Sequence, residues 1–274
     1  MDSIVLLGTG CPSPSHERFG PSTLVTSGNQ NILIDAGSGV TQRLSEHGLK
    51  PSAIDIILIT HLHSDHIVDL YQLYISGWHS GRTKPFKLVG PRGIEKFFNK
   101  TMEAYDDELS LRIEWEKRPN KGGLEIEIIE INEEFTFDDQ DIKIKSIEVQ
   151  HQPVEPAYGY EFLVKNKKVT YSGDTKYSKN LENASKNAEY LIHEVFVDLN
   201  FDDKRMTQDT LKNVKEYHST PEDVGKLAQA ANVKNLVLNH FVPPVFDEEG
   251  LRSEISKHYD GKIIVGSDLD VFNL

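Results

Sequence analysis

The sequence has almost no cysteine, no long apolar run and no excess of basic residues. Its single cysteine, Cys11, cannot form an internal disulfide, which favours a reducing compartment. No apolar stretch is long enough to span a bilayer, and the apolar start at residues 4–7 is too short for a secretory signal. We therefore expect a cytoplasmic protein that makes no contact with a membrane.

Basic residues are outnumbered by acidic ones, 30 Lys and Arg against 43 Asp and Glu, so the net charge is −13. Such a charge repels polyanions at long range, whereas nucleic-acid binding usually depends on clustered Lys and Arg. Basic patches are short, as at residues 165–168. The charge balance therefore disfavours an RNA substrate.

The 274 residues, of which 38% are hydrophobic and 27% charged, have the composition of an ordinary globular protein. Strand-like and helix-like stretches alternate along the chain, without a linker, repeat or low-complexity segment. We therefore expect one domain, residues 1–274, of the α/β class, in which packed sheets are covered by helices.

The hydrophobic periodicity and the turn signals predict the individual elements. Predicted helices are Thr41–His47, Ser64–Ser76, Ile94–Tyr105, Thr220–Ala231 and residues 248–258. Predicted strands are Ser3–Leu7, Ser22–Thr26, Asn31–Asp35, Ile54–Ile59, Phe86–Val89, Leu124–Ile131, Phe135–Phe137, Ile142–Val149, Tyr158–Val164, Lys168–Tyr171, Leu191–Val195, Asn235–Leu238 and two short strands at the end. The Asn166-Lys167 pair predicts a hairpin turn.

A dense cluster of metal-binding side chains follows the buried strand Ile54–Ile59. His61, His63, Asp65 and His66 lie within six residues, at a predicted turn from strand to helix. Such a turn can bring four side chains to one point, and borderline metals such as zinc accept imidazole and carboxylate ligands. The alternative, a polar solvated loop, does not need this density of ligands.

Three later residues follow predicted strands in the same manner. His151, Asp174 and His240 each come directly after a strand. Residues at strand ends along one edge of a sheet can meet in a common site. Each alone is a weak indication, because a single His at a strand end is usually a surface residue, but together with the cluster they predict one site.

These residues together resemble the metal-binding series of the metallo-β-lactamase superfamily. Leu7-Gly8-Thr9-Gly10, Ile34-Asp35-Ala36-Gly37 and His218-Ser219-Thr220 fit the same resemblance. The last of these points to the branch that contains ribonuclease Z and arylsulfatase-like hydrolases. The resemblance implies a four-layered αββα sandwich, in which two mixed sheets are flanked by helices.

The resemblance also implies a metal centre with two ions. One metal would be held by His61, His63 and His151, and the second by Asp65, His66 and His240, with Asp174 bridging them. The resemblance implies two zinc ions, with manganese or iron as alternatives, because oxygen and nitrogen sites discriminate poorly between such metals.

Asp65, His218 and Glu194 are the implied catalytic residues. His218 would donate a proton to the leaving oxygen, and Glu194 would orient the His218 imidazole. Alternatively, Glu194 is a buried acid with a structural role. Asp35 is expected to bond a ligand His, the alternative being a turn-forming residue.

The sequence departs from ribonuclease Z in two places. That enzyme usually carries a long basic arm, whereas only residues 161–170 separate Tyr160 from Tyr171 here. It also tends to have His-Glu-Ala-Thr where this chain has His193-Glu194-Val195-Phe196. Both departures disfavour tRNA as a substrate and leave the hydrolytic centre intact.

Our first hypothesis is a dinuclear zinc hydrolase that cleaves phosphodiester or related aryl ester bonds with a metal-bridging hydroxide, acting on small or aryl substrates. The alternatives are a tRNA 3′ processing endonuclease, an arylsulfatase-like or promiscuous esterase or lactonase, and a catalytically silent metal-binding scaffold. A homodimer is expected, since two-fold dimers are the commonest oligomers. Trp78 and Arg82 are predicted either at the substrate entrance or, for Trp78, in the core.

Overall fold

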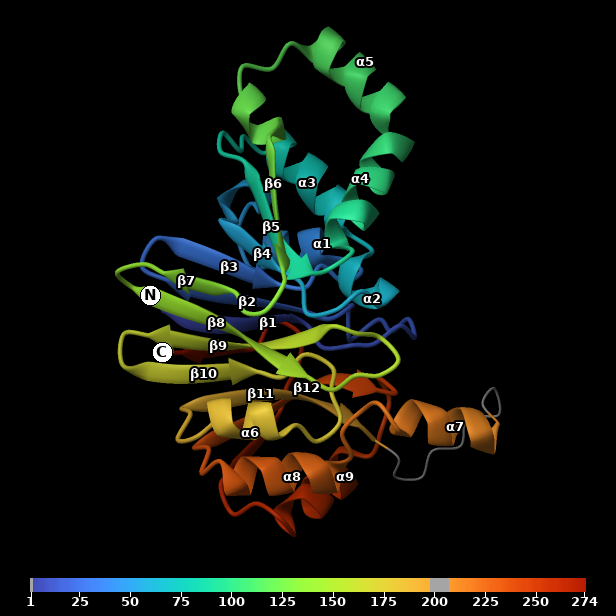
Figure 1. Ribbon diagram of the computed structural model, residues 1–274, viewed down its shortest axis with the longest axis vertical. Coiled ribbons are helices and arrows are strands. Elements are labelled where there is room, and N and C mark those ends of the chain that lie inside the picture. Colours follow the sequence, from blue (N-terminus) through green and yellow to red (C-terminus); the bar gives the residue numbers. More distant parts are fainter. Residues whose placement is uncertain (1, 198–206) are drawn as a thin grey trace.

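The computed structural model describes residues 2–197 and 207–274. Two seven-stranded sheets face each other, and helices cover their outer faces (Figure 1). This is the four-layered αββα sandwich that the resemblance to the metallo-β-lactamase superfamily implies. Among the described residues, no helix is both long and apolar enough to cross a membrane.

The first sheet has the strand order β14-β1-β2-β3-β4-β5-β6. Its strands are β14 (Val271–Asn273), β1 (Ser3–Gly8), β2 (Ser22–Ser27), β3 (Gln30–Ile34), β4 (Ile56–Leu58), β5 (Phe86–Pro91) and β6 (Ile126–Ile131). Pairing is antiparallel from β14 to β3 and parallel from β3 to β6. The short strand β4 is entirely apolar and buried, as expected for a parallel strand covered on both faces.

The second sheet has the order β13-β12-β11-β10-β9-β8-β7. Its strands are β13 (Lys262–Val265), β12 (Asn235–Val242), β11 (Tyr190–Phe196), β10 (Lys167–Tyr171), β9 (Ala157–Val164), β8 (Ile142–Val149) and β7 (Thr136–Asp138). It too is mixed, antiparallel from β7 to β10 and parallel from β10 to β13. The predicted β9–β10 hairpin is confirmed, but its turn is Lys165-Asn166, one residue earlier than predicted.

Helices cover the outer face of each sheet. The first sheet is covered by α1 (Val40–Glu46), α3 (Leu70–His79) and α4 (Ile94–Ala104), and the second by α6 (Lys179–Ala184), α8 (Pro221–Ala230) and α9 (Glu248–Ser256). The remaining helices are α2 (Ser64–Ile67), α5 (Asp106–Glu116), α7 (Gln208–Lys215) and the 3-10 turns η1 (Pro51–Ala53) and η2 (Lys121–Leu124). At the start of α8, Thr220 and Asp223 form a capping box and Pro221 opens the helix.

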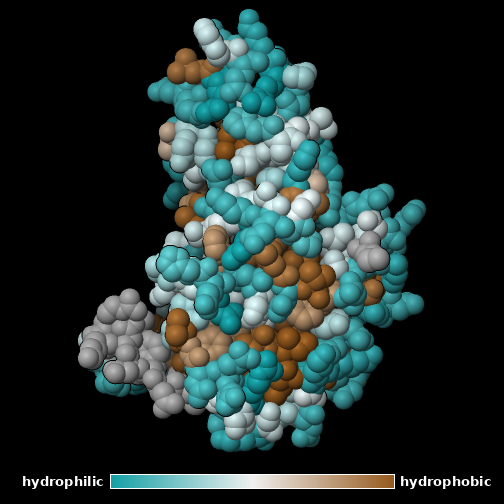
Figure 2. All heavy atoms as spheres, turned by 180° about the vertical axis from the view of Figure 1, so that it is seen from behind, coloured by the Kyte–Doolittle hydropathy of each residue, from teal (hydrophilic) through white to brown (hydrophobic). Residues whose placement is uncertain are grey.

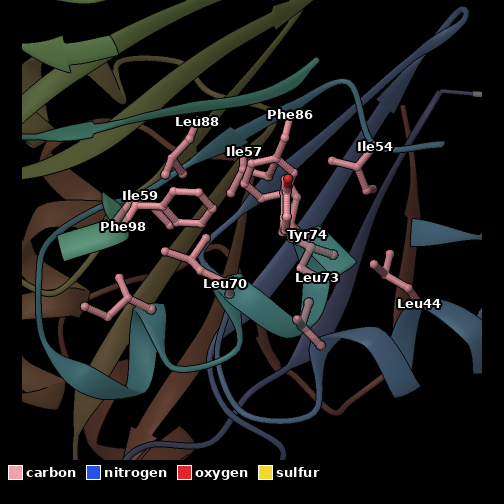
Figure 3. Close-up of a cluster of buried hydrophobic side chains, with 14 of the residues drawn as sticks. Leu44, Ile54, Ile57, Ile59, Leu70, Leu73, Tyr74, Phe86, Leu88 and Phe98 are labelled. Carbon is pink, nitrogen blue, oxygen red and sulfur yellow. The ribbon is translucent and has the colours of Figure 1, made fainter. Parts of the chain in front are cut away.

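The core between the first sheet and its helices shows how helix periodicity produces this packing (Figure 3). Leu70, Leu73 and Tyr74 recur at helical spacing on α3 and face the apolar strand residues. Tyr74 meets the ring of Phe86 edge-on, with 5.4 Å between centroids, and Phe86 stacks on Phe98 at 5.6 Å. A second core, which includes Tyr160 and Phe162, fills the space between the sheets, and a third lies under α8 and α9.

Two predictions about the N-terminal half are corrected. The helix predicted at Ser64–Ser76 is two helices, α2 and α3, because the chain leaves the helix at Val68–Asp69. Trp78 is only 2% exposed and belongs to the core. Arg82 is 3% exposed and donates to the backbone carbonyls of Tyr74 and Gly123, so it does not line a substrate entrance.

Helices α5, α6 and α7 were not predicted. The hydrophobic residues of α5 do not follow a clear stripe, since Leu109 is buried while Leu111 and Trp115 are 68% and 88% exposed. Figure 1 shows α4 and α5 extending beyond the sandwich, and Figure 2 shows that this end is largely hydrophilic. A helix with few core contacts lacks the periodic pattern from which it could be predicted.

Candidate metal centre

The chain turns that follow several strands place the predicted metal ligands at one end of the sandwich. His61 and His63 follow β4, Asp65 and His66 belong to α2, and His151 and Asp174 follow β8 and β10. Glycine is required before Asp174, because Gly173 has a φ of +59° and a Cβ there would lie 2.5 Å from the carbonyl oxygen of Tyr158. Strand ends from both sheets thus meet at one end of the sandwich.

His240 reaches the site in a different way from the one predicted. It does not follow the end of a strand but lies inside β12, which continues to Val242. The pairing with β11 shifts at this point, and His240 has a φ of +43°. It is therefore the extra residue of a β-bulge, a distortion that redirects a side chain next to a functional site.

The first group of potential ligands consists of His61, His63, His151 and Asp174. His63 Nδ1 lies 2.9 Å from His61 Nε2 and 3.0 Å from His151 Nε2. The Asp174 Oδ2 atom lies 3.7 Å from His61 Nε2 and 3.9 Å from His151 Nε2. Three imidazole nitrogens and one carboxylate oxygen thus point to a common centre.

The second group consists of Asp65, His66 and His240. The Nε2 atoms of His66 and His240 are 3.1 Å apart, and Asp65 Oδ2 lies 3.3 Å from His240 Nε2. Asp174 Oδ2 is 3.4 Å from His66 Nε2 and 3.3 Å from His240 Nε2. Asp174 therefore lies between the two groups, where a bridging ligand would be.

Neighbouring groups hold these imidazoles in place through their other ring nitrogen. His66 Nδ1 donates to Asp35 Oδ2 at 2.8 Å, and His151 Nδ1 donates to the backbone carbonyl of Tyr217 at 2.8 Å. Asp35 also accepts from the backbone N–H of Thr60 at 2.8 Å, and the Thr60 hydroxyl lies 3.0 Å from His61 Nδ1. Such contacts set the tautomer, so that the nitrogen facing the site carries a lone pair.

The two groups fit divalent transition metals. A tetrahedral metal with Zn–N bonds of 2.0–2.1 Å separates its ligand nitrogens by roughly 3.4 Å, close to the nitrogen separations seen here. Burial is the main reason why the pKa of His61, His63 and His151 is lowered. These imidazoles are therefore neutral and able to bind a metal.

In the second group, unlike the first, the carboxylates favour protonated imidazoles. Burial alone would lower the pKa of His240, but Asp174 and Asp65 raise it to about 9. Burial alone would raise the pKa of Asp174, but His240, His66 and His61 hold it well below its usual value. The carboxylates therefore already attract positive charge, and a metal bound here would displace protons.

His218 lies beside the metal ligands without belonging to either group. It is 6% exposed, and its Nδ1 lies 3.1 Å from Glu194 Oε1, which also accepts from the backbone N–H groups of Thr175 and Ser219. Burial would lower the pKa of His218, but the charge and hydrogen bond of Glu194 raise it above its usual value. The structure thus brings the three predicted catalytic residues, Asp65, His218 and Glu194, into one region.

A cavity of about 260 Å³ opens over these residues. Its polar wall includes His63, Asp65, Asp174, His218 and His240. Its apolar wall consists of Phe196, Val214, Tyr217, Val242 and Pro243, and Cys11–Ser13 close one side. A small ligand with one ionic end and one apolar or planar end fits such a site.

Sequence analysis missed Thr60 and Tyr217 as parts of the site. Thr60 separates β4 from the His cluster and Tyr217 precedes His218, but nothing else in the sequence distinguishes them. Their roles depend on contacts with Asp35 and His151, far away along the chain. Only their position next to predicted site residues could have drawn attention to them.

Comparison with known proteins places this site in a family. The family described as "Anti-Pycsar protein Apyc1" matches residues 3–237. Ribonuclease Z of Mycobacterium marinum (strain ATCC BAA-535 / M) is 31% identical over 277 residues, covering 98% of this chain and 97% of the relative. Ribonuclease Z of Mycobacterium bovis (strain BCG / Pasteur 1173P2) is 32% identical over 275 residues, with the same coverage.

Solved structures show the same fold. The metallo-β-lactamase fold protein YhfI from Bacillus subtilis has a TM-score of 0.76 at 20% identity, covering 99% of this chain and 98% of that one. Human tRNase Z, short form, has a TM-score of 0.70 at 24% identity, covering 98% of each chain. The chain therefore belongs to the family described as anti-Pycsar protein Apyc1, in the ribonuclease Z-like branch of the metal hydrolases with the metallo-β-lactamase fold.

Proposed function

We propose that the protein is a dinuclear zinc phosphodiesterase that acts on small substrates, with cyclic mononucleotides as the first candidates. The small two-sided cavity over the paired ligand groups carries this proposal. Its volume of about 260 Å³ suits a ligand smaller than the drug-sized ones that occupy roughly 300–1,000 Å³. The matching family is one of cyclic-nucleotide-degrading proteins, which supports the choice of substrate.

When bound, two divalent metals supply Lewis acidity that polarises the phosphoryl group and makes a water molecule more acidic. The seven residues of the two ligand groups would hold these ions, and Asp35 and the Tyr217 carbonyl keep two of the imidazoles oriented. The Asp65 carboxylate lies at the rim of the second group, in the cavity wall, where it can accept a proton from the attacking water.

His218 completes the reaction at the other end of the scissile bond. A basic leaving alkoxide needs a proton, and the raised pKa of His218 keeps that proton available near neutral pH. Glu194 accepts from His218 Nδ1, so Nε2 is the atom that donates to the leaving oxygen. The buried Glu194 thereby both orients the imidazole and stabilises its charged form.

The test is turnover of a substrate panel by protein loaded with zinc, manganese or iron. The panel contains 3′,5′-cyclic mononucleotides, an aryl phosphodiester, an aryl sulfate, a carboxyl ester, a lactone and a precursor tRNA. We expect phosphodiester turnover, highest with zinc, to fall at least about a hundredfold in His218→Ala and in Asp65→Ala. Turnover of sulfate, ester or lactone alone would refute the proposal, and inactivity on every substrate would favour the silent scaffold.

A second candidate is tRNA 3′ processing, which the 31% identity to ribonuclease Z over the full chain favours. Against it stands the net charge of −13, which repels a polyanion such as tRNA at long range. Cleavage of precursor tRNA alone, without turnover of cyclic nucleotides, would support this candidate over the first.

A further inference from the structure

The described wall of the cavity over the metal ligands offers little positive charge. Among the described residues that line it, none is Lys or Arg, and two wall residues, Pro12 and Pro243, have no backbone N–H to donate. Phosphoryl transfer spreads negative charge over the non-bridging oxygens, which catalysts stabilise with positive charge or with oriented donors. Beyond the metal ions and His218, the wall residues that the structure describes supply neutral donors for that purpose.

Four side chains in the wall could donate: the hydroxyls of Ser13, Ser64 and Tyr217 and the thiol of Cys11. A thiol is a weak donor. Ser64 is exposed and Ser13 is half-exposed, so water competes for both hydroxyls. Tyr217 is also half-exposed, but it differs from both serines because its ring packs directly on the imidazoles of the first ligand group.

The Tyr217 ring lies edge-on to His151, with 5.1 Å between centroids, and 6.2 Å from the ring of His63. Its backbone carbonyl accepts from His151 Nδ1, so that Tyr217 contacts the first ligand group through both its backbone and its ring. Within the part of the chain that the structure describes, no hydrogen bond of the Tyr217 hydroxyl is found. The ordinary pKa of a tyrosine is about 10, so this hydroxyl keeps its proton near neutral pH.

We propose that the Tyr217 hydroxyl donates a hydrogen bond to a non-bridging oxygen of the phosphoryl group as charge develops there. This inference rests on the proposed phosphodiesterase function. Tyr217 forms and breaks no covalent bond, and His218 remains the group that gives a proton to the leaving oxygen. Because the ring is held against the metal-binding imidazoles, the donor is oriented before the substrate arrives, and no reorganisation is needed during the reaction.

The test is Tyr217→Phe, which removes the hydroxyl and keeps the ring. Tyr177→Phe is the matched control, because Tyr177 donates to Glu182 and does not line the cavity. Both variants are loaded with metal and assayed on an aryl phosphodiester and a cyclic mononucleotide. In Tyr217→Phe we expect kcat to fall about ten- to a hundredfold, in the range of a lost neutral or oxyanion donor, with unchanged KM, melting temperature and metal content.

Inhibition by inorganic vanadate gives a second readout, because its charged oxygens would occupy the phosphoryl position. The inhibition constant should rise in Tyr217→Phe and stay unchanged in Tyr177→Phe. Unchanged kcat in Tyr217→Phe, or a rise in KM alone, would overturn the inference while leaving the phosphodiesterase intact. An inactive parent protein would overturn the proposed function and the inference together.

Discussion

Asp35→Asn tests whether the metal centre depends on the residues that orient its ligands. Asp35 is fully buried, with a φ of +60°, a backbone conformation that Asn also tolerates. The new carbonyl oxygen can still accept from the Thr60 N–H, but its amide group would then face the Nδ1–H of His66. His66 can relieve this clash by moving its proton to Nε2, the atom that faces the second ligand group.

The expected result is a loss of affinity at one of two metal sites. Removing a partner that orients a ligand His typically weakens metal binding about 10- to 100-fold, which corresponds to roughly 1.4–2.7 kcal/mol. Titration with zinc in competition with a chromogenic chelator should show two tight ions in the parent and one tight and one weakened ion in the variant.

Asp69→Asn is the matched control for this experiment. Its carboxylate accepts from the backbone N–H of Gly39 at 2.7 Å, and among the described residues it makes no hydrogen bond with a metal-binding His. We expect the control to keep both tight sites. Two equally tight ions in Asp35→Asn would refute the reasoning, because the contact with His66 would then have no influence on the metal.

Three further results are expected. Glu194→Gln removes the charge that raises the pKa of His218. Because a proton donor is lost as the pH rises through its pKa, the alkaline limb of the kcat/KM profile should move to lower pH by about one unit. An unmoved limb would contradict the pairing of His218 with Glu194. Phe98→Ala should cost about 3–5 kcal/mol in chemical denaturation, whereas Leu111→Ala, at an exposed site, should cost less than about 0.5 kcal/mol; equal losses would contradict the core assignment. Removal of metal by a chelator should lower the melting temperature, since an ion at 100 times its Kd stabilises the folded state by about 2.7 kcal/mol, and re-addition should restore it.

Much of the fold and of the site could be predicted from local sequence patterns, which do not depend on contacts with distant parts of the chain. The apolar strand before His61 and the ligand spacing through His66 are determined over a few residues, and so is the capping box of α8 at Thr220. The alternation of strands and helices predicts two layers of sheet covered by helices, because each apolar face needs a partner. These features depend on side-chain chemistry and chain geometry alone.

Two of the three helices that sequence patterns did not predict, α5 and α7, have few neighbours in the core. Helices α5 and α7 bury one residue and none, respectively, so their sequences show no continuous apolar stripe. The break between α2 and α3 is likewise invisible in the sequence, since apolar residues continue at helical spacing across it. The boundary between α2 and α3 lies directly after the turn of helix that carries Asp65 and His66 in the site.

The sequence by itself determined which residues could bind metals and which layers the chain would form. Only the tertiary structure decided how the residues meet: the bulge that turns His240 inward, the Asp35 carboxylate on His66, the Tyr217 carbonyl on His151, and the burial of Trp78 in the core. The physical reason is distance along the chain. A ligand cluster within six residues is brought together by local geometry, whereas contacts across 31 or 66 residues exist only after the strands of each sheet have paired and the following segments have packed against them.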